Sequence, residues 1–378
     1  MSDGYAAKVV VQQLKLSNYR NYRTFSVNFS GKHVVFTGHN GAGKTNLLEA
    51  ISLLSPGRGL RRSTYGDLIC ASADNNSFVV FAKLYSDLFD EVDIGTTCDN
   101  ADGGRKVRIN GTSTSADRLT DYCRISWLIP AMDGLFTGSA SDRRRFLDRM
   151  VLSIDPSHGR RVVDFEKVMR SRNRLLLDGN TNNGWFDALE TQMAELATAI
   201  AAARIDVIRL LDGGRESDSD DIFPHPILVI EGLLEQALIN QSAIDVEEYY
   251  RQKLHDGRPL DQAAGRTLEG PHRSDMKVFY AQKNMPAALC STGEQKSLLM
   301  GLILAHAKIT AQISGMAPIL LLDEMAAHLD EQRRIALFNI LDELGGQSFM
   351  TGTDRQLFNA LEDRAEFFEI SDGALLPL

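Results

Sequence analysis

A glycine-rich loop constrains the fold of this chain more than any other feature of its sequence. Residues 38–45 (GHNGAGKT) match the pattern G-x-x-x-x-G-K-[ST]. A β-forming apolar run, residues 33–37, leads into the loop, and residues 46–54 carry leucines and an isoleucine at helical spacing after it. The loop is therefore predicted to join a strand to a helix, where its backbone N–H groups can surround phosphate oxygens.

Length and composition limit the class of protein. A chain of 378 residues is long enough for two or three domains. With 43% hydrophobic and 24% charged residues, the composition is that of a globular protein. The four cysteines form no C-x-x-C pair, and neither a signal pattern nor an uninterrupted apolar run of membrane-spanning length is visible. We therefore expect a cytoplasmic protein without a disulfide framework.

The rest of the chain is predicted to alternate between β-rich and helical regions. Short β-forming runs dominate about residues 67–130, where Asn110-Gly111 predicts a hairpin turn, and residues 141–255 are mostly helical. Strands and helices then alternate, which predicts a parallel sheet covered by helices. The expected fold class is α/β. We expect one domain, called the head below, to comprise residues 1–140 and 256–378 and to include an antiparallel β subdomain at 67–130. Residues 141–255 are expected to form a separate helical subdomain, called the lid.

One helical seam and one acidic segment stand out in the lid. Apolar side chains recur at spacings of four and three in Leu189, Met193, Leu196, Ile200, Ala203, Val207 and Leu211. A bundle helix in a compact lobe is the favoured interpretation, and a short projecting coiled-coil arm is the alternative. Residues 212–221 (DGGRESDSDD) are acidic and aperiodic, which predicts a solvated loop or a partly disordered excursion.

An apolar strand, residues 319–322, ends in Asp323 and Glu324. Such a strand suits a Walker B element, which delivers carboxylates to the carboxyl edge of a parallel sheet. With the glycine-rich loop as Walker A, Lys44 is expected to neutralise the β- and γ-phosphates of ATP. Thr45 and Asp323 are expected to hold Mg²⁺, and Glu324 to orient the attacking water.

Residues 291–296 (STGEQK) are predicted to open a helix with Ser291 as its cap and Gly293 exposed to another backbone. With Walker A and Walker B, this segment resembles the signature motif of ABC-type ATPase heads. That resemblance implies a dimer in which the signature of one subunit contacts the γ-phosphate held by the other. It also makes Asp330 the D-loop residue and Thr353 the switch residue. The predicted nucleotide contacts are Gly38, His39, Asn40, Gly41, Ala42, Gly43, Lys44, Thr45, Asn46, Ser291, Gly293, Asp330 and Thr353.

Longer stretches resemble the RecF family of bacterial recombination mediators. They are residues 16–22 (LSNYRNY), 38–51, 142–148 (DRRRFLD), 171–176 (SRNRLL), 270–275 (GPHRSD) and 322–330. The resemblance implies a weak, DNA-stimulated ATPase of recombinational and replication-gap repair in the DNA-damage (SOS) response. It also implies ATP-dependent homodimerisation on double-stranded or gapped DNA, partnership with RecR and RecO, and help in loading RecA at single-strand gaps.

Two features depart from the pattern of that superfamily. No glutamine occurs between Asn46 and Met150, so the usual Q-loop ligand is absent, and Asp133 is the candidate substitute. The signature has Thr292 and Glu294 where glycine-rich or glutamine-containing versions are commoner.

A basic region is the candidate DNA contact. Residues 143–174 contain ten basic and four acidic residues, although the whole chain has a net charge of −9. A basic stripe that follows phosphates would give affinity without base reading and a steep dependence on salt. The candidate contacts are Arg58, Arg61, Arg62, Arg143, Arg144, Arg145, Arg172 and Arg174.

Two other ATPase classes share parts of this pattern. The nucleotide-binding subunit of a membrane transporter also carries Walker A, signature and Walker B, but the roughly 245 residues between Thr45 and Ser291 exceed its short helical insert. A structural ATPase of the SMC type needs long coiled coils, whereas the seam of residues 186–211 is short.

Overall fold

The computed structural model describes residues 6–73, 76–98, 103–179, 182–213, 222–371 and 373–377. The chain divides into two compact units. The first unit holds the described parts of residues 1–133, 220–224 and 299–378, and the second holds those of residues 134–219 and 225–298. Most of the predicted acidic loop, residues 214–221, lies outside the described residues.

A six-stranded sheet in the order β17-β16-β4-β15-β14-β9 forms one layer of the first unit. Its strands are β4 (His33–Thr37), β9 (Ile125–Leu128), β14 (Ile319–Leu322), β15 (Ser348–Thr351), β16 (Ala365–Ser371) and β17 (Ala374–Pro377). Neighbouring strands are parallel except β16 and β17. The predicted parallel sheet is therefore confirmed. Strands β4 and β14 end at the same edge, with β15 between them.

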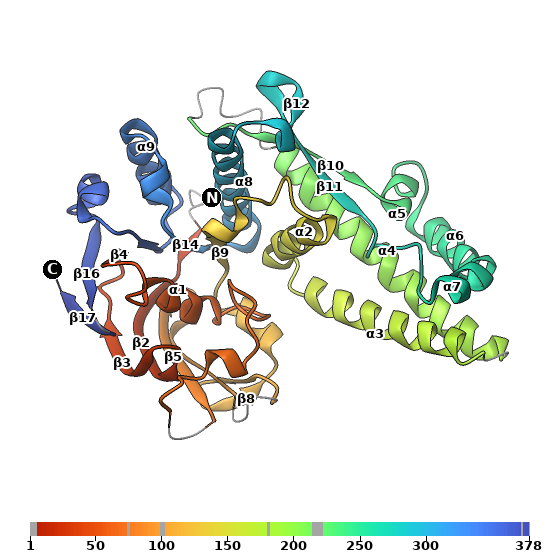
Figure 1. Cartoon of the computed structure of the whole chain (residues 1–378), viewed down its shortest axis with the longest axis horizontal. Helices are drawn as coiled ribbons and strands as arrows, with labels where there is room; N and C mark the ends of the chain where they lie inside the picture. Colours follow the sequence, from red (N-terminus) through yellow and green to blue (C-terminus); the bar gives the residue numbers. More distant parts are fainter. Residues whose placement is uncertain are drawn as a thin grey trace. The chain divides into compact units, whose positions relative to one another are not determined.

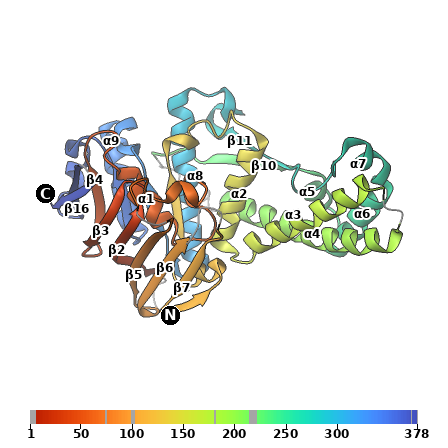
Figure 2. The same ribbon diagram turned by 60° about the horizontal axis from the view of Figure 1, so that its bottom comes forward.

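A second sheet in the first unit is antiparallel and has the order β3-β2-β5-β6-β7-β8, as Figure 2 shows. Its strands are β2 (Val10–Tyr19), β3 (Tyr22–Asn28), β5 (Phe78–Ser86), β6 (Asp90–Cys98), β7 (Lys106–Ile109) and β8 (Thr112–Thr114). The predicted hairpin is present, since Asn110 (φ 49) and Gly111 (φ 78) both have the positive φ that such a turn needs. The N-terminal hairpin, β2 and β3, joins this sheet because β2 pairs with β5.

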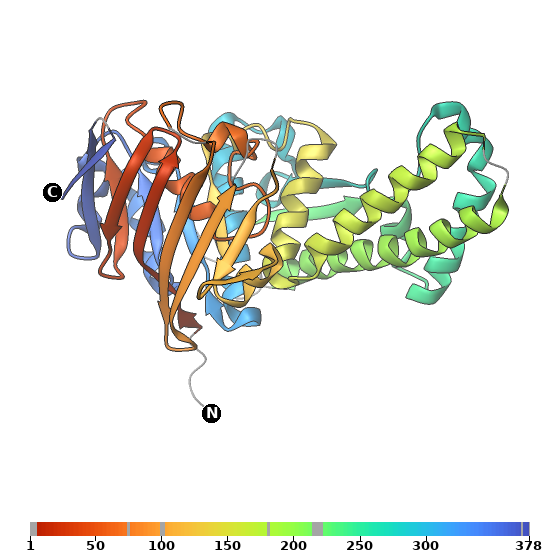
Figure 3. The same ribbon diagram turned by 90° about the horizontal axis from the view of Figure 1, so that it is seen from below.

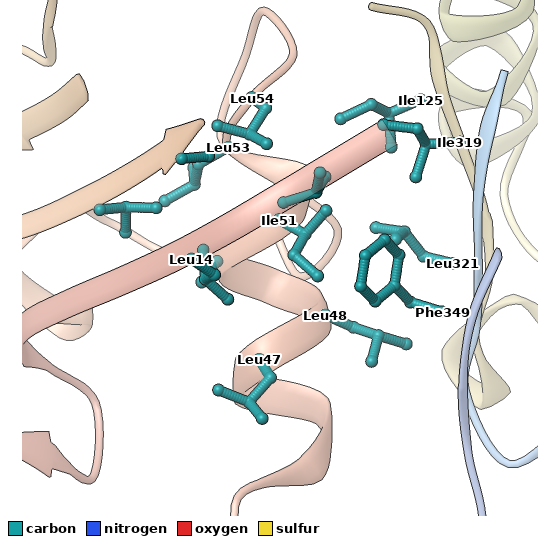
Figure 4. Packing of buried hydrophobic residues seen from close by; sticks show 14 of the residues in the cluster. Leu14, Leu47, Leu48, Ile51, Leu53, Leu54, Ile125, Ile319, Leu321 and Phe349 are labelled. Atoms are coloured by element: carbon teal, nitrogen blue, oxygen red, sulfur yellow. The ribbon is translucent and has the colours of Figure 1, made fainter. Parts of the chain in front are cut away.

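Helix α1 (Lys44–Ser52) begins directly after the glycine-rich loop and packs in the core of the first unit. In Figure 4, Leu48 and Ile51 on α1 point toward Leu321 and Phe349 on the parallel sheet. All four side chains are buried. This packing fixes the start of α1, and with it the loop, against the sheet that carries the Walker B strand.

The remaining elements of the first unit are short, apart from α9 (Glu331–Glu343) and most of α8 (Thr292–Ser314). They are β1 (Ala7–Lys8), β13 (Met316–Ala317), and the 3₁₀ turns η1 (Gly66–Leu68), η2 (Ala116–Asp121), η3 (Pro130–Met132), η7 (Met325–His328) and η8 (Arg355–Leu361). Helix α8 is apolar and long enough to cross a membrane, but 72% of its most apolar window is buried, which is typical of a core helix.

The second unit is built around a helical bundle. Its helices are α2 (Ala140–Ile154), α3 (His158–Leu177), α4 (Asn183–Gly213), α5 (Leu233–Ala237), α6 (Ala243–Asp256) and α7 (Arg258–Ala264). The long helices α3 and α4 lie side by side in Figure 3. Met193 and Ile200 of the predicted seam pack on α4 against Phe165 and Tyr250. The bundle interpretation of the seam is therefore confirmed.

A strand pair in the second unit was not predicted. Strand β10 (Pro226–Glu231) pairs antiparallel with β11 (Asp275–Tyr280), and the two lie side by side in Figure 1. The short elements β12 (Met285–Pro286), η5 (Ala281–Lys283) and η6 (Ala287–Leu289) follow. Residues 256–298, which the sequence analysis assigned to the head, fall in the second unit. The β10–β11 pairing and the contact of Arg172 on α3 with Asp261 on α7 hold them there.

Candidate nucleotide-binding site

The glycine-rich loop adopts a conformation that requires glycine at Gly38 and Gly43. Gly38 has φ 141, and a Cβ there would lie 2.4 Å from the carbonyl oxygen of Ile370. Gly43 has φ 111, and its Cβ would lie 2.5 Å from Asn21 Nδ2. By contrast, a Cβ at Gly41 would meet no heavy atom within 4 Å among the described residues. The loop is thus closely supported on one side and open at Gly41, as a cradle for phosphate requires.

The turn between β2 and β3 holds this loop from the supported side. Asn21 Nδ2 donates to the carbonyl oxygen of Ala42 at 3.2 Å, and the Tyr22 hydroxyl donates to that of Gly43 at 3.2 Å. Asn46 Nδ2 on α1 donates to Asn21 Oδ1 at 2.8 Å. Residues 16–22 stand out in the sequence by their family resemblance, which does not predict this role. Their local pattern predicts a turn but not its distant partner.

Arg20 in the same turn binds α1 through a buried carboxylate. Its Nε and Nη2 atoms each lie 2.8 Å from an oxygen of Glu49, whose side chain has no exposed surface. Arg20 Nη2 also donates to the Ser63 hydroxyl at 2.6 Å. Arg61 approaches the same carboxylate at 3.5 Å and donates to Asn46 Oδ1 at 2.6 Å. The turn, the loop and the start of α1 therefore form one hydrogen-bonded assembly.

Lys44 is 4% exposed and folds back over the loop. Its Nζ donates to the carbonyl oxygens of Gly38 at 2.8 Å and His39 at 3.0 Å. Burial lowers the pKa of Lys44, while the charges of Glu324 and Asp323 act in the opposite direction. A cationic donor at an open loop is what phosphate oxygens require, so these residues fit a nucleotide phosphate.

Walker A and Walker B meet at the carboxyl edge of the parallel sheet. The Thr45 hydroxyl lies 2.9 Å from Oδ1 and 3.1 Å from Oδ2 of Asp323, although the two residues are 278 positions apart. The Thr351 hydroxyl donates to Asp323 Oδ1 at 2.7 Å. Because Mg²⁺ prefers hydroxyl, carboxylate and water oxygens, Thr45 and Asp323 together fit that ion. Thr351 is not among the predicted site residues, because its side chain carries no charge and matches no motif.

The predicted signature residues lie in the second unit at the start of α8. Ser291 and Glu294 form a capping box: Glu294 Oε2 accepts from the Ser291 backbone N–H and hydroxyl, both at 2.9 Å. An ion pair with Lys283 and these bonds from Ser291 lower the pKa of Glu294 to about 2. Gly293 is exposed, and a Cβ there would meet nothing within 4 Å among the described residues. Glu294 thus turns back onto its own helix end, and the Gly293 backbone stays accessible.

The other predicted nucleotide contacts lie at loop positions. Asp330 caps α9 by accepting from the Arg333 backbone N–H at 2.8 Å. Thr353 is exposed two residues after β15, and His39 and Asn40 are exposed in the glycine-rich loop. Asp133 follows η3, which itself follows β9, the strand paired with β14. The candidate Q-loop substitute is therefore carried by the strand beside Walker B.

The arginines predicted to contact DNA differ in accessibility. Arg58, Arg61, Arg62, Arg145 and Arg174 are exposed. Arg143 binds both oxygens of Asp275, at 2.7 and 2.9 Å, and Arg144 donates to the carbonyl oxygen of Ser274 at 2.7 Å. Arg172 has no exposed surface and binds Glu190 and Asp261. A fully buried side chain cannot touch a DNA phosphate, so Arg172 is removed from the predicted contacts.

The family model described as "RecF/RecN/SMC N terminal domain" matches residues 10–374. The chain is 60% identical over 370 residues to the DNA replication and repair protein RecF of Brucella suis biovar 1, covering 97% of this chain and 96% of that protein.

Two solved structures show the same fold at lower identity. The structure of the recombination mediator protein RecF-ATPrS in the RecFOR pathway matches 99% of this chain and 100% of that one, with a TM-score of 0.85 and 24% identity. The Smc head domain of Pyrococcus furiosus matches 98% of this chain and 96% of that one, with a TM-score of 0.54 and 16% identity. These similarities confirm the predicted ABC-type head fold.

Proposed function

This chain belongs to the RecF family of DNA replication and repair proteins, and we propose that it binds ATP·Mg²⁺ and uses it to dimerise on DNA. The observation that carries the proposal is the partly buried hydrogen bond between Thr45 and Asp323 at 2.9 Å. This contact brings the ends of Walker A and Walker B together, although the two motifs are far apart in the sequence. ATP hydrolysis, which the family implies, would then occur at this edge of the sheet.

The described side chains supply distinct parts of that chemistry. The loop N–H groups and Lys44 would bind the phosphates, and Thr45 and Asp323 would hold Mg²⁺. Glu324 would orient the attacking water and accept its proton. The bound ion would offset the charge that develops on the phosphate oxygens.

We propose that the site is completed by a second copy of the chain. Ser291 and Gly293 of one protomer would approach the γ-phosphate held by the other, with Asp330 and Thr353 at the same junction. The exposed Gly293 backbone supports this arrangement, since a ligand can approach it closely. Slow hydrolysis would then reset the dimer.

DNA would bind through phosphate contacts. Arg58, Arg61, Arg62, Arg145 and Arg174 are exposed and support such contacts more strongly than Arg143 and Arg144, which are partly buried and bonded to Asp275 and Ser274. Double-stranded or gapped DNA is the proposed substrate. RecR and RecO are proposed partners, with RecA loading as the downstream step, in the cytoplasm.

A structural ATPase of the SMC type was one of the two alternatives. The family model covers both groups, but the relative at 60% identity over 97% of the chain is a RecF protein. The longest helix among the described residues is α4 (Asn183–Gly213), and it packs in a bundle. These observations favour the RecF function.

Binding of a fluorescent ATP analogue, with and without Mg²⁺, tests the first part of the proposal. The wild-type chain is expected to bind the analogue and to hydrolyse ATP when Mg²⁺ is present. Lys44→Ala should weaken binding by about tenfold or more, because a charge-assisted contact to phosphate is lost. Equal binding by both proteins would contradict the assigned site.

A further inference from the structure

The Thr351 hydroxyl links the two consecutive acidic residues of the Walker B strand. It donates to Asp323 Oδ1 at 2.7 Å and accepts from the backbone N–H of Glu324 at 2.9 Å. A hydroxyl has one proton, so the bonds form a single chain from the Glu324 amide through Thr351 to the Asp323 carboxylate. Thr351 can do this because β15 lies between β4 and β14 in the sheet.

Two of the side chains in this chain of hydrogen bonds are buried, so water does not compete for their bonds. Thr351 is 1% exposed and Asp323 is 5% exposed. Hydrogen bonds to a charged group are stronger than neutral ones, and a buried group that loses its partner cannot turn to water instead. The Thr351 hydroxyl therefore restricts the rotation of the Asp323 carboxylate.

Among the described residues, the Thr45 side chain also binds Asp323, and its hydroxyl has a second proposed task. It lies 2.9 Å from Asp323 Oδ1 and is also the proposed Mg²⁺ ligand. Thr351 is not a proposed Mg²⁺ ligand. Its hydrogen bond to Asp323 therefore does not depend on how the Thr45 hydroxyl is oriented toward the ion.

The same hydroxyl fixes an unusual backbone conformation at Glu324. Glu324 has φ 55, in the left-handed region that residues other than glycine rarely adopt. Such a conformation persists only where its surroundings impose it. The hydrogen bond from the Glu324 amide to Thr351 is one such restraint, and the backbone at Glu324 sets the direction in which its carboxylate leaves the chain.

We propose that Thr351 is a positioning residue that sets the Asp323 carboxylate and the Glu324 backbone together. The inference rests on the proposed function, in which Asp323 holds Mg²⁺ and Glu324 orients water. Thr351 acts through these two residues and does not itself contact the reacting atoms. It is distinct from Thr353, the exposed residue that the sequence analysis assigned as the switch.

Three variants separate the hydroxyl from the shape of the side chain. Thr351→Val removes the hydroxyl at nearly constant volume, and Thr351→Ser keeps the hydroxyl. Thr198→Val is the matched control, because the Thr198 hydroxyl is buried and makes no hydrogen bond to the described residues. If Thr351→Val does not fold, Thr351→Ala removes the same hydroxyl and replaces it in every measurement.

The first measurement needs neither nucleotide nor metal. Hydrogen exchange of the Glu324 amide is expected to be about tenfold faster or more in Thr351→Val than in the wild type, because the acceptor of that amide is lost. Thr351→Ser and Thr198→Val should exchange at the wild-type rate. Unchanged exchange in Thr351→Val would overturn the backbone part of the inference.

The second measurement is steady-state ATP hydrolysis as a function of Mg²⁺ concentration. Thr351→Val is expected to lower kcat by about tenfold or more and to raise the half-saturating Mg²⁺ concentration, with little change in KM for ATP. Thr351→Ser should restore both values. Wild-type kcat and Mg²⁺ dependence in Thr351→Val would overturn the inference, even if amide exchange had changed. A wild-type chain that neither binds nor hydrolyses ATP would instead contradict the proposed function.

Discussion

Arg20 and Glu49 form a two-point ion pair, with both nitrogen–oxygen distances at 2.8 Å and no exposed surface on the glutamate side chain. Arg20 comes from the turn between β2 and β3, and Glu49 comes from α1. The pair therefore fastens the turn that holds the glycine-rich loop to the helix that follows this loop.

Removal of one partner of this ion pair should lower the stability of the folded protein. Arg20→Ala leaves a buried carboxylate with weaker compensation and is expected to lower the free energy of unfolding by about 3–5 kcal/mol. Urea denaturation measures it. Arg118→Ala, which removes an exposed pair with Asp121, should change stability by less than about 1 kcal/mol. Because an apolar pair can replace a buried ion pair, Arg20→Met with Glu49→Leu should be more stable than Arg20→Ala alone. Equal losses in the two Arg→Ala variants would contradict this account.

Gly43 should be more sensitive to substitution than its size suggests. Gly43→Ala would place a methyl group 2.5 Å from Asn21 Nδ2 and 2.7 Å from the Tyr22 hydroxyl, at φ 111. We expect affinity for ATP to fall by about tenfold or more, since the loop must shift to relieve the contact. Gly104→Ala is the control, because its Cβ would meet nothing within 4 Å among the described residues. Fluorescence titration with an ATP analogue compares the two, and equal affinities would refute the prediction.

Asp148 should make the stability of the second unit depend on pH. Burial raises the pKa of Asp148, but the charge of Arg204 and the hydrogen bond from His158 outweigh it and bring the value to about 2. An unfolded aspartate has a pKa of about 3.9. The folded form therefore binds its proton less readily, and the contribution is present above about pH 4 and lost as pH falls toward about 2.

Asp148→Asn removes that contribution. The variant should be less stable than the wild type by about 2 kcal/mol near neutral pH, and the difference should shrink as pH falls below about 4. Chemical unfolding at a series of pH values measures it. Asp164→Asn is a control, since Asp164 lies 3.6 Å from Arg160 in a pair that is exposed on both sides. A difference for Asp148→Asn that stays constant down to about pH 3 would contradict the assignment.

Substitutions of Arg172 and Arg174 should have different effects on stability and on DNA binding, although only one residue separates the two on α3. Arg172→Ala breaks buried contacts with Glu190 and Asp261 and should destabilise the chain by about 3–5 kcal/mol. Arg174 has 85% of its side chain exposed, so Arg174→Ala should leave stability unchanged, weaken DNA binding and reduce its salt dependence. Salt titrations of binding to gapped duplex test this. Arg174→Ala with wild-type affinity would remove Arg174 from the contact surface.

The parts of the site that lie in continuous motifs could be predicted from sequence. A strand, a glycine-rich loop and a helix follow one another at residues 33–54, and Asp323 ends an apolar strand, so local pattern sufficed. Contacts between distant segments could not be predicted in this way. The hydrogen bonds from Asn21 to Ala42 and from Thr351 to Asp323 both depend on sheet pairing over long sequence separations.

Runs of charged residues in the sequence predicted side-chain exposure least reliably. Arg172 belongs to a basic run, which suggested exposure, but its carboxylate partners come from α4 and α7 and bury it. No local pattern reports such partners, because they are 18 and 89 residues away. The pairing of β10 with β11 escaped prediction for the same reason, since helices α5, α6 and α7 lie between the two strands in the sequence.

The mass of the protein in solution tests the central claim most directly. We expect the wild-type chain to have twice the monomer mass with ATP and Mg²⁺ on gapped DNA, once the mass of the DNA is subtracted, and to return to the monomer mass with ADP. Lys44→Ala should stay monomeric with ATP, because the shared nucleotide is not held. A wild-type chain that remains monomeric with ADP, with ATP and with ATP plus gapped DNA would contradict the proposal that ATP bridges two copies.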